Sequence, residues 1–341
     1  MDYKVLVNHN NEILISNNKK KIYLDPKNVQ DESLIFISHA HTDHLLNKKN
    51  LKKFNLKNRI ISSTETSTIA NSRGFLIRDF VEEFEDFKLI DNGHILGSKG
   101  LLINDDIFYT SDLSIRNRAF LKRPVIPRVS TLIIESTFGK PQYKFPPIEK
   151  IIHQVNSLIA EMYSRGIPVI LMGYSLGKAQ ILTALFGSWK PLIVHDDIHK
   201  FNDIYRKFGV ELENSIKLTD AVSKEILKNK PWVLIYPLTS GRQKFIKFLK
   251  EKYNAVTIGF SGWAINKNYS HIMNLDYTIP FSDHCDFNEL IEVVRKSNPS
   301  KVFTFHGFQE EFADYLKKLG FDAEPVYNRN ITKNRSLDNF L

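Results

Sequence analysis

The chain has very little cysteine and no long apolar run. Its 341 residues include one cysteine, Cys285, so no disulfide can form within the chain, and a metal site would have to use imidazole and carboxylate ligands. No segment approaches the roughly 20 apolar residues that a membrane-spanning helix needs. The first 15 residues alternate apolar and polar side chains like a strand and lack the charged-then-apolar order of a signal peptide. We therefore expect a cytoplasmic protein without a membrane span.

Basic residues outnumber acidic ones. Lys and Arg total 47 against 38 Asp and Glu, which gives a formal net charge of +9, and lysines cluster at 17–22 and 47–59. Such a charge attracts polyanions. Charge alone leaves two interpretations open, a solubilising lysine surface and a surface that binds nucleic acid.

The spacing of hydrophobic residues changes partway along the chain. Up to about residue 135, short β-branched or aromatic runs are separated by Asn, Asp, Gly and Lys, which is typical of a mostly antiparallel sheet. From about residue 146, apolar runs of strand length alternate with stretches of helical spacing, which indicates a parallel α/β unit. The predicted fold class is therefore α/β.

Three histidines and an aspartate stand within the seven residues "SHAHTDH" (38–44), directly after the apolar run "LIFI". At an extended strand end, residues i and i+2 face the same way, so His39 and His41 can reach one cation. A turn into the following segment would aim Asp43 and His44 at a second cation beside the first. This density of ligands after a buried strand predicts a metal site rather than ordinary polar loop residues.

Five further candidates end strand-like runs or lie in glycine-flanked loops, where a rigid sheet can hold ligands in place. They are His94 in "DNGHILGS", Asp112 in "YTSD", Glu135 in "TLIIE", His284 in "SDHCDF" and His306 in "FTFHG". A carboxylate at Asp112 can bridge two cations about 3.5–4 Å apart. Taken singly, each has an ordinary alternative, such as a turn-capping aspartate or a surface histidine.

Together these motifs resemble the metallo-β-lactamase superfamily, and more narrowly its β-CASP nucleases, over nearly the whole chain. "HAHTDH" is similar to the signature motif of the superfamily, "GHILGS" to its third motif and "YTSD" to its fourth, while "IESTFG", "FSDHCDF" and "FTFHG" are similar to motifs of the nuclease branch. The resemblance implies an αββα sandwich with an inserted, reduced β-CASP-like α/β domain. It assigns 1–145 and 266–341 to the sandwich and 146–265 to the insertion.

The resemblance also implies a role for each site residue. Two metals would be held by His39, His41 and His94 on one side and by Asp43, His44 and His306 on the other, with Asp112 as the bridge. Asp25 in "YLDP" matches the structural aspartate of the first motif. His284 would be the general acid and Glu135 would orient it, with Asp43 as a third catalytic residue. The expected cofactors are two zinc ions, and the same ligands would also accept manganese or cobalt.

Two glycine-bearing loops are candidates for contact with a nucleic-acid backbone. "LMGYSLGKAQ" (171–180) places Gly177 and Lys178 at a strand-to-helix turn, where N–H groups and an ammonium can hold a phosphate. It is not a P-loop, because the glycine spacing is one residue short and Ala179 stands where Ser or Thr would hold magnesium. "TSGRQKF" (239–245) offers Arg242 and Lys244. Ordinary strand-to-helix turns are the alternative for both loops.

The predicted function is a dinuclear zinc nuclease that hydrolyses phosphodiester bonds of RNA, internally, from an end, or both. His306 is similar to the residue of RNA-processing members, and the short insertion resembles archaeal mRNA 3′-end processing factor-like proteins and bacterial ligase-associated exonucleases. A DNA exonuclease in repair is the main alternative, with single-stranded DNA as partner. A small-molecule metallo-hydrolase and a silent scaffold subunit are further alternatives. Cys285 is expected to be a packing residue, and the oligomeric state is left open.

Overall fold

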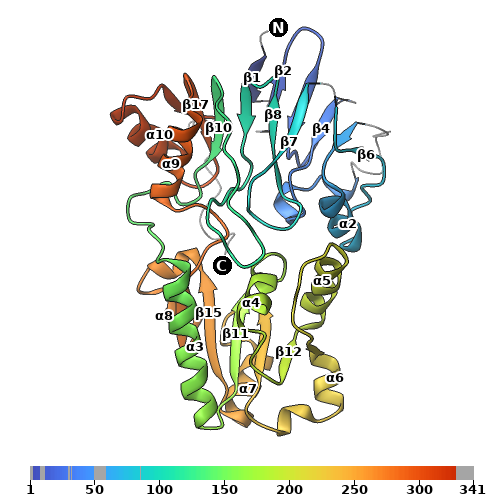
Figure 1. Cartoon of the computed structure of the whole chain (residues 1–341), viewed down its shortest axis with the longest axis vertical. Helices are drawn as coiled ribbons and strands as arrows, with labels where there is room; N and C mark the ends of the chain where they lie inside the picture. The colour runs from blue at the N-terminus through green and yellow to red at the C-terminus, as the bar shows by residue number, and fades with distance from the viewer. Residues whose placement is uncertain are drawn as a thin grey trace.

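Three six-stranded sheets organise the chain in the computed structural model, which describes residues 3–7, 12–29, 31, 33–49, 59–84 and 86–327. Two of the sheets form the upper part of the molecule in Figure 1, and the third lies below them between helices. Most of the second lysine cluster, residues 50–58, lies outside the described residues, so its part in a basic surface stays a prediction.

The first sheet has the order β1-β2-β3-β4-β5-β6. Its strands are β1 (Lys4–Val7), β2 (Ile13–Ser16), β3 (Lys21–Leu24), β4 (Leu34–Phe36), β5 (Ile60–Ile61) and β6 (Phe80–Val81). The pairs from β1 to β3 are antiparallel, but those from β3 to β6 are parallel. The expectation of a mostly antiparallel sheet was wrong here. Helix α2 (Thr64–Ser72) makes the crossover from β5 to β6, and its polar sequence hides the helical spacing of its buried residues.

The second sheet combines strands from residues 87–135 with strands from residues 301–325. Its order is β18-β17-β10-β9-β8-β7, with β7 (Phe87–Asp91), β8 (Lys99–Ile103), β9 (Ile107–Tyr109), β10 (Thr131–Glu135), β17 (Lys301–Phe305) and β18 (Ala323–Pro325). The strands β7, β8 and β9 pair antiparallel, whereas β9, β10, β17 and β18 pair parallel. Glu135 at the end of β10 thus lies beside Phe305 at the end of β17. Helices α9 (Phe287–Ser297) and α10 (Gln309–Lys318) cover the outer face of this sheet (Figure 1).

The first and second sheets pack face to face, and helices pack against their outer faces. Alternation along β10 shows this directly, because Ile133 joins the core between the sheets while Leu132 and Ile134 join the core under α9 and α10. On the other side, Ile69 of α2 packs against Ile35 of β4. The predicted αββα sandwich is therefore confirmed.

The third sheet is parallel throughout, with the order β13-β12-β14-β11-β15-β16. Its strands are β11 (Val169–Gly173), β12 (Leu192–Val194), β13 (Ile216–Lys217), β14 (Val233–Pro237), β15 (Val256–Ser261) and β16 (Tyr277–Pro280). Its helices are α3 (Ile148–Ser164), α4 (Lys178–Phe186), α5 (Asp196–Lys207), α6 (Leu218–Ser223), α7 (Lys244–Tyr253) and α8 (Tyr269–Met273). This is the predicted inserted α/β unit. The boundaries at 145/146 and 265/266 stay a prediction. Strand β16 belongs to this sheet although it follows the predicted boundary at 265/266.

The carboxyl ends of all six parallel strands lie at one edge of the third sheet, and that edge meets the sandwich. The loop after β11 makes the contact, since His41 bonds to the carbonyl of Leu176 at 3.2 Å and a Cβ on Gly177 would lie 2.4 Å from Ile95 Cγ2. Gly177 also has a φ of 87°, so only glycine fits this close approach without strain. In α/β sheets this edge is where ligands bind.

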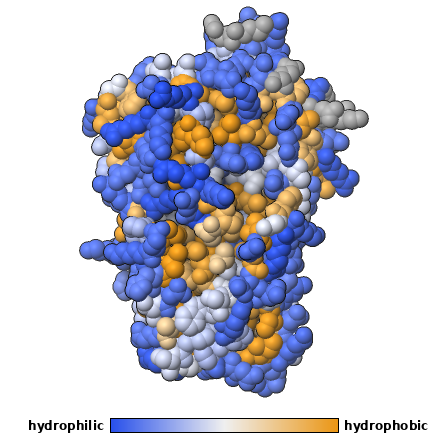
Figure 2. Space-filling view, viewed as in Figure 1, coloured by the Kyte–Doolittle hydropathy of each residue, from blue (hydrophilic) through white to orange (hydrophobic). Residues whose placement is uncertain are grey.

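Within the described residues, no helix has the length and apolar character to cross a membrane. On the face drawn in Figure 2, hydrophobic side chains form separate patches among hydrophilic ones, without a continuous apolar belt. The core is instead inside each layer, where large side chains such as Phe36, Phe312 and Trp232 are fully buried.

Asp286 at the start of α9 generates a stability prediction. Its carboxylate accepts the N–H of Glu289 at 3.0 Å as a helix cap, and also the N–H of Phe145 at 3.0 Å and Arg116 Nη2 at 2.6 Å. Asp286→Ala is expected to lower the free energy of unfolding by about 2–4 kcal/mol in urea denaturation, because it removes the cap and one of the two carboxylates that pair with the partly buried Arg116 guanidinium.

The control is Asp314→Ala, an exposed aspartate on α10 whose ion pair lies at the surface. We expect it to change the free energy of unfolding by less than about 0.5 kcal/mol. Equal losses for the two variants would contradict the role given to Asp286.

Candidate metal centre

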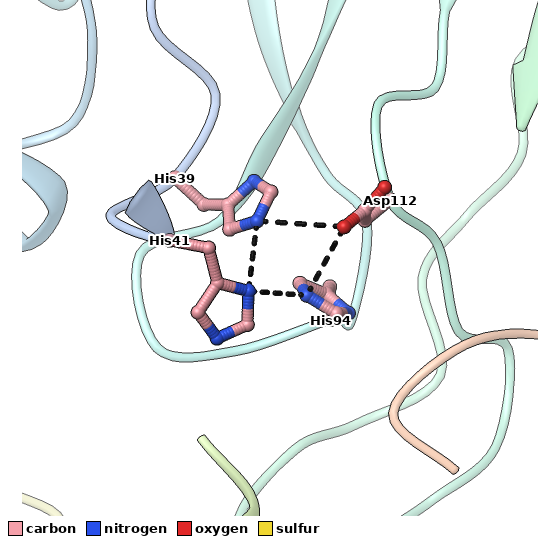
Figure 3. Close-up of side chains that lie close together, drawn as sticks. All are labelled: His39, His41, His94 and Asp112. Atoms are coloured by element: carbon pink, nitrogen blue, oxygen red, sulfur yellow. Dashed lines mark hydrogen bonds and ion pairs between the residues drawn. The ribbon is translucent and has the colours of Figure 1, made fainter. Parts of the chain in front are cut away.

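Ligands from three separate turns converge where the two sheets of the sandwich meet the third. The loop after β4 carries His39 and His41 and then turns through η1 (Thr42–His44), His94 lies between β7 and β8, and Asp112 follows β9. Figure 3 shows that His39, His41, His94 and Asp112 point toward one another. Gly93 permits the turn at His94, because its φ is 71° and a Cβ there would lie 2.3 Å from a carbonyl oxygen.

The first group of ligand atoms surrounds one small volume. His41 Nδ1 lies 3.1 Å from both His39 Nε2 and His94 Nε2, and Asp112 Oδ2 lies 3.6 Å from the same two Nε2 atoms. One ligand atom from each of the four residues lies within 4.8 Å of all the others. Three nitrogens and one oxygen at these separations match the donor types of a zinc site.

Each histidine ring has one nitrogen that faces the cluster, called here the inner nitrogen, and one that faces away from it. The hydrogen bond of the nitrogen that faces away shows that the inner nitrogen carries a lone pair. His94 Nδ1 donates to the carbonyl of Asp283 at 3.0 Å, and His41 Nε2 donates to the carbonyl of Leu176 at 3.2 Å. A carbonyl can only accept, so the inner nitrogen of each ring has no proton. Burial lowers the pKa of His39, His41 and His94, which keeps these rings neutral. Lone pairs that face each other at 3.1 Å repel unless a cation lies between them, so the residues fit a metal ion.

A second group shares Asp112 with the first. His44 Nε2 lies 3.3 Å from Asp112 Oδ2, and His306 Nδ1 lies 3.6 Å from Asp112 Oδ1. His44 Nε2 and Asp112 Oδ1 are buried, and neither makes an aligned hydrogen bond within the described part of the chain. Buried polar atoms without partners indicate a missing ion or water. Burial acts to raise the pKa of Asp112, but the imidazoles of His44 and His284 outweigh it and hold the pKa well below its usual range.

Asp25 orients His44 from behind. Its carboxylate accepts the N–H of Ser38 at 2.7 Å, the hydroxyl of Tyr109 at 3.0 Å and the hydroxyl of Ser111 at 2.9 Å, and it pairs with His44 Nδ1 at 2.9 Å. This leaves His44 Nε2 for the metal side. Such an aspartate behind a ligating histidine raises the basicity of the ligand and holds its ring in place.

Asp43 is the predicted ligand that the structure leaves outside both groups. Its side chain is 63% exposed, and its Oδ2 lies 3.8 Å from His44 Nε2. Ligation by Asp43 therefore stays a prediction.

His306 is brought to the second group by an unusual backbone conformation, because its φ is 58° and Ser136 Oγ donates to its carbonyl at 2.6 Å.

Glu135 and His284 form a pair beside the cluster. Glu135 is fully buried at the end of β10, accepts the N–H of Leu113 at 2.6 Å, and places both oxygens 3.0 Å from His284 Nδ1. His284 Nε2 then faces Asp112 Oδ2 at 4.0 Å. Burial acts to lower the pKa of His284, but Glu135 and Asp112 outweigh it and raise the pKa to about 9. The next residue, Cys285, is buried in the core under α9, as expected for a packing residue.

The proposed nucleic-acid contacts are placed differently from one another. The N–H of Gly177 donates to Gln180 Oε1 at 2.7 Å, and Lys178 is buried with its Nζ 3.7 Å from Asp283 Oδ2, so both have partners within the protein. Arg242 and Lys244 are exposed at the carboxyl edge of the third sheet. All four contacts stay predictions.

Arg118 is a site residue that the sequence did not reveal. It is fully buried, donates from Nη2 to the carbonyl of His94 at 3.0 Å, and pairs through Nη1 with Asp283 Oδ1 at 3.2 Å. It therefore supports the backbone of one ligand and the residue before His284. In "SIRNRAF" nothing distinguishes it from a surface arginine.

Comparison with known proteins agrees with this geometry. Residues 273–326 match the family model described as a Zn-dependent metallo-hydrolase RNA specificity domain. The chain is 28% identical to a probable DNA ligase of Opitutus terrae over 313 aligned positions, covering 86% of this chain and 29% of that protein. It is 26% identical to an RNase J-like protein of Methanocaldococcus jannaschii over 268 positions, covering 65% of this chain and 63% of that protein. The chain thus spans less than two thirds of each of these relatives.

A solved structure of a protein of unknown function from Enterococcus faecalis V583 shares the fold. The TM-score is 0.61 at 13% identity, over 93% of this chain and 94% of that chain. Fold, ligand cluster and relatives together support one class of protein for this chain, the metallo-β-lactamase superfamily. Within that superfamily the relatives support the β-CASP nuclease branch, in agreement with the resemblance found in the sequence.

Removal of the shared carboxylate tests the cluster as a metal site. We expect zinc-loaded Asp112→Asn protein to lose most of the bound zinc, measured by mass spectrometry after gel filtration, because Asp112 belongs to both ligand groups. Zinc should also raise the Tm of the wild-type protein, since a ligand present at 100 times its Kd stabilises the folded state by about 2.7 kcal/mol.

The matched control is His153→Ala, an exposed histidine on α3. This variant should keep the wild-type zinc content and the zinc-dependent rise in Tm. Wild-type zinc content in Asp112→Asn would show that the cluster is not the metal site.

Proposed function

We propose that the protein is a metal-dependent phosphodiesterase that hydrolyses nucleic acid. The observation that carries the proposal is that the Glu135–His284 pair lies beside a cluster of imidazoles and a carboxylate. His284 Nε2 is 4.0 Å from Asp112 Oδ2 of that cluster. Two zinc ions are the proposed occupants because two ligand groups share Asp112, and manganese or cobalt also suits these donors. Cations held there would supply Lewis-acid chemistry at a phosphoryl group.

His284 is the proposed general acid. Glu135 holds its Nδ1–H, so the ring presents Nε2 toward the cluster, where it can give a proton to the leaving oxygen. The side chain is 22% exposed, which leaves it reachable from solvent and by a substrate. Glu135 is a positioning residue in this scheme, since its oxygens are used by His284 and by the N–H of Leu113.

RNA is one candidate substrate. The family model that matches residues 273–326 is described as an RNA specificity domain, and this range contains both His284 and His306. The RNase J-like relative supports the same class of substrate.

DNA is the other candidate, and the coverage and gaps of the two alignments favour it. The match to the probable DNA ligase covers 86% of this chain in 313 positions, whereas the match to the RNase J-like protein needs 268 positions to cover 65%. The first match therefore has fewer gaps over a longer stretch, so that relative shares the compact form of this chain. We give DNA the greater weight for this reason.

A variant of His284 separates metal binding from chemistry. His284→Ala is expected to keep the wild-type zinc content and to lose about 10²–10⁴-fold in hydrolysis rate, the usual contribution of a general acid. Asp43→Ala, in contrast, should lose metal and activity together if its carboxylate moves in to ligate. Normal cleavage by His284→Ala would show that another group supplies the proton.

Side-by-side hydrolysis identifies the substrate. Zinc-loaded protein is incubated with 5′-labelled single-stranded RNA and DNA of the same sequence, with Asp112→Asn as the blank. We expect DNA to be cut faster, and a ladder or a single terminal product distinguishes internal from end attack. Faster cleavage of RNA would reverse the ranking, and cleavage of neither would contradict the proposed function.

A further inference from the structure

A cluster of partly exposed aromatic rings lies beside His284 and has no part in the chemistry described above. Its members, called here the aromatic cluster, are Tyr143, Trp263 and Phe308. They come from the loop before α3, from η3 (Gly262–Ile265) and from the turn after β17. Tyr143 and Phe308 stack at 5.4 Å between ring centroids, and Trp263 stands at 89° to Tyr143 at 5.6 Å.

Phe138 connects the aromatic cluster to the site. Its ring is buried and lies 4.9 Å from Trp263 and 6.1 Å from His284. Gly262 permits this packing, because a Cβ there would lie 2.3 Å from Phe138 Cζ. Ser261 Oγ accepts the N–H of Trp263 at 3.2 Å, which fixes the backbone that carries the indole. The cluster is thus held at a fixed place relative to His284.

The polar ends of the Tyr143 and Trp263 rings make no hydrogen bond within the part of the chain that the structure describes. Trp189 Nε1 donates to Asn156 Oδ1 at 2.8 Å, and Trp232 Nε1 donates to the carbonyl of Leu227 at 3.1 Å. The indole N–H of Trp263 makes no hydrogen bond within the described residues. Rings that only fill a core are fully buried and have their polar atoms satisfied. The aromatic cluster therefore has surface and hydrogen-bonding capacity left for a ligand.

Basic side chains accompany the rings. Lys140 Nζ lies 4.2 Å from the Phe308 ring and 3.0 Å from Glu311 Oε1, and Lys144 is exposed next to Tyr143. Aromatic faces with adjacent cations are how proteins bind unpaired nucleobases and the phosphates between them. A base inside a duplex has both faces covered by its neighbours and cannot stack in this way.

We propose that the aromatic cluster binds one unpaired nucleobase next to the bond to be cut, with Trp263 as the main stacking partner. The substrate at this site is then a single strand, whatever its sugar. This inference rests on the proposed function and deepens it, because it names the strand form that the site selects.

The test measures affinity in a His284→Ala background, so that the oligonucleotide is not cut. Fluorescence anisotropy gives the Kd of a labelled single-stranded DNA with Trp263 intact, with Trp263→Ala and with Trp263→Phe. The same measurement is repeated with strands that carry one abasic nucleotide at successive positions. Trp263→Ala is expected to weaken binding of the intact strand by about 10-fold, with Trp263→Phe restoring most of it.

The abasic strands separate stacking from a structural effect. At one position the missing base should weaken binding to the Trp263 protein about 10-fold and add no loss in Trp263→Ala, because the two changes remove the same contact. Phe248→Ala, an exposed ring on α7, should bind all strands like its parent. Equal weakening of intact and abasic strands at every position, or no weakening at all, would overturn the stacking proposal.

Failure of this inference and failure of the proposed function give different results. Wild-type protein that cuts single strands but shows no coupling between Trp263 and any base would overturn the stacking alone. Zinc-loaded wild-type protein that neither binds nor cuts RNA or DNA would overturn both.

Discussion

The buried carboxylate of Asp112 is the contact on which the arrangement of the site depends. It is only 4% exposed, and its two oxygens lie within 4.0 Å of imidazoles from the loops after β4, β7, β16 and β17. A charge withdrawn from water to this extent is costly without compensation. Both sheets of the sandwich and the edge of the third sheet must therefore be in place before Asp112 has its partners.

A second set of buried charges connects the third sheet to this centre. Asp283, 2% exposed, lies between Arg118 of the sandwich and Lys178 at the start of α4, and its carbonyl accepts the ring Nδ1–H of His94. Loss of one member of such a group leaves an uncompensated buried charge, which generally costs about 3–5 kcal/mol. The inserted sheet thus helps to support His94, a candidate metal ligand, as well as covering the site.

The sequence pointed to the residues of the cluster because they are dense in short motifs, and their ligation of a metal stays a prediction. His39, His41 and His44 lie within six residues, and the turn that separates them is short enough to fix their directions. The sequence did not reveal that Lys178 is buried, because an ion pair with Asp283, 105 positions further on, leaves no local pattern. Nor did it reveal the parallel pairing of β3 to β6, since that depends on crossovers with weak periodicity.

Exposure differs sharply across the centre, and the difference gives a direction of approach. His39 and His94 are fully buried, whereas His306 is 42% exposed and Asp43 63%. The side of His306 is therefore the open side of the cluster, from which a phosphate would approach under the proposed function. Phe308 of the aromatic cluster follows His306 by two residues, and the His284 ring lies 6.1 Å from that of Phe138, which contacts Trp263 of the same cluster. Under the proposed function, a strand that enters along this side would meet the rings, the candidate metal ligands and the proposed proton donor, so positioning of the base and protonation of the leaving oxygen would be set by the same few segments of chain.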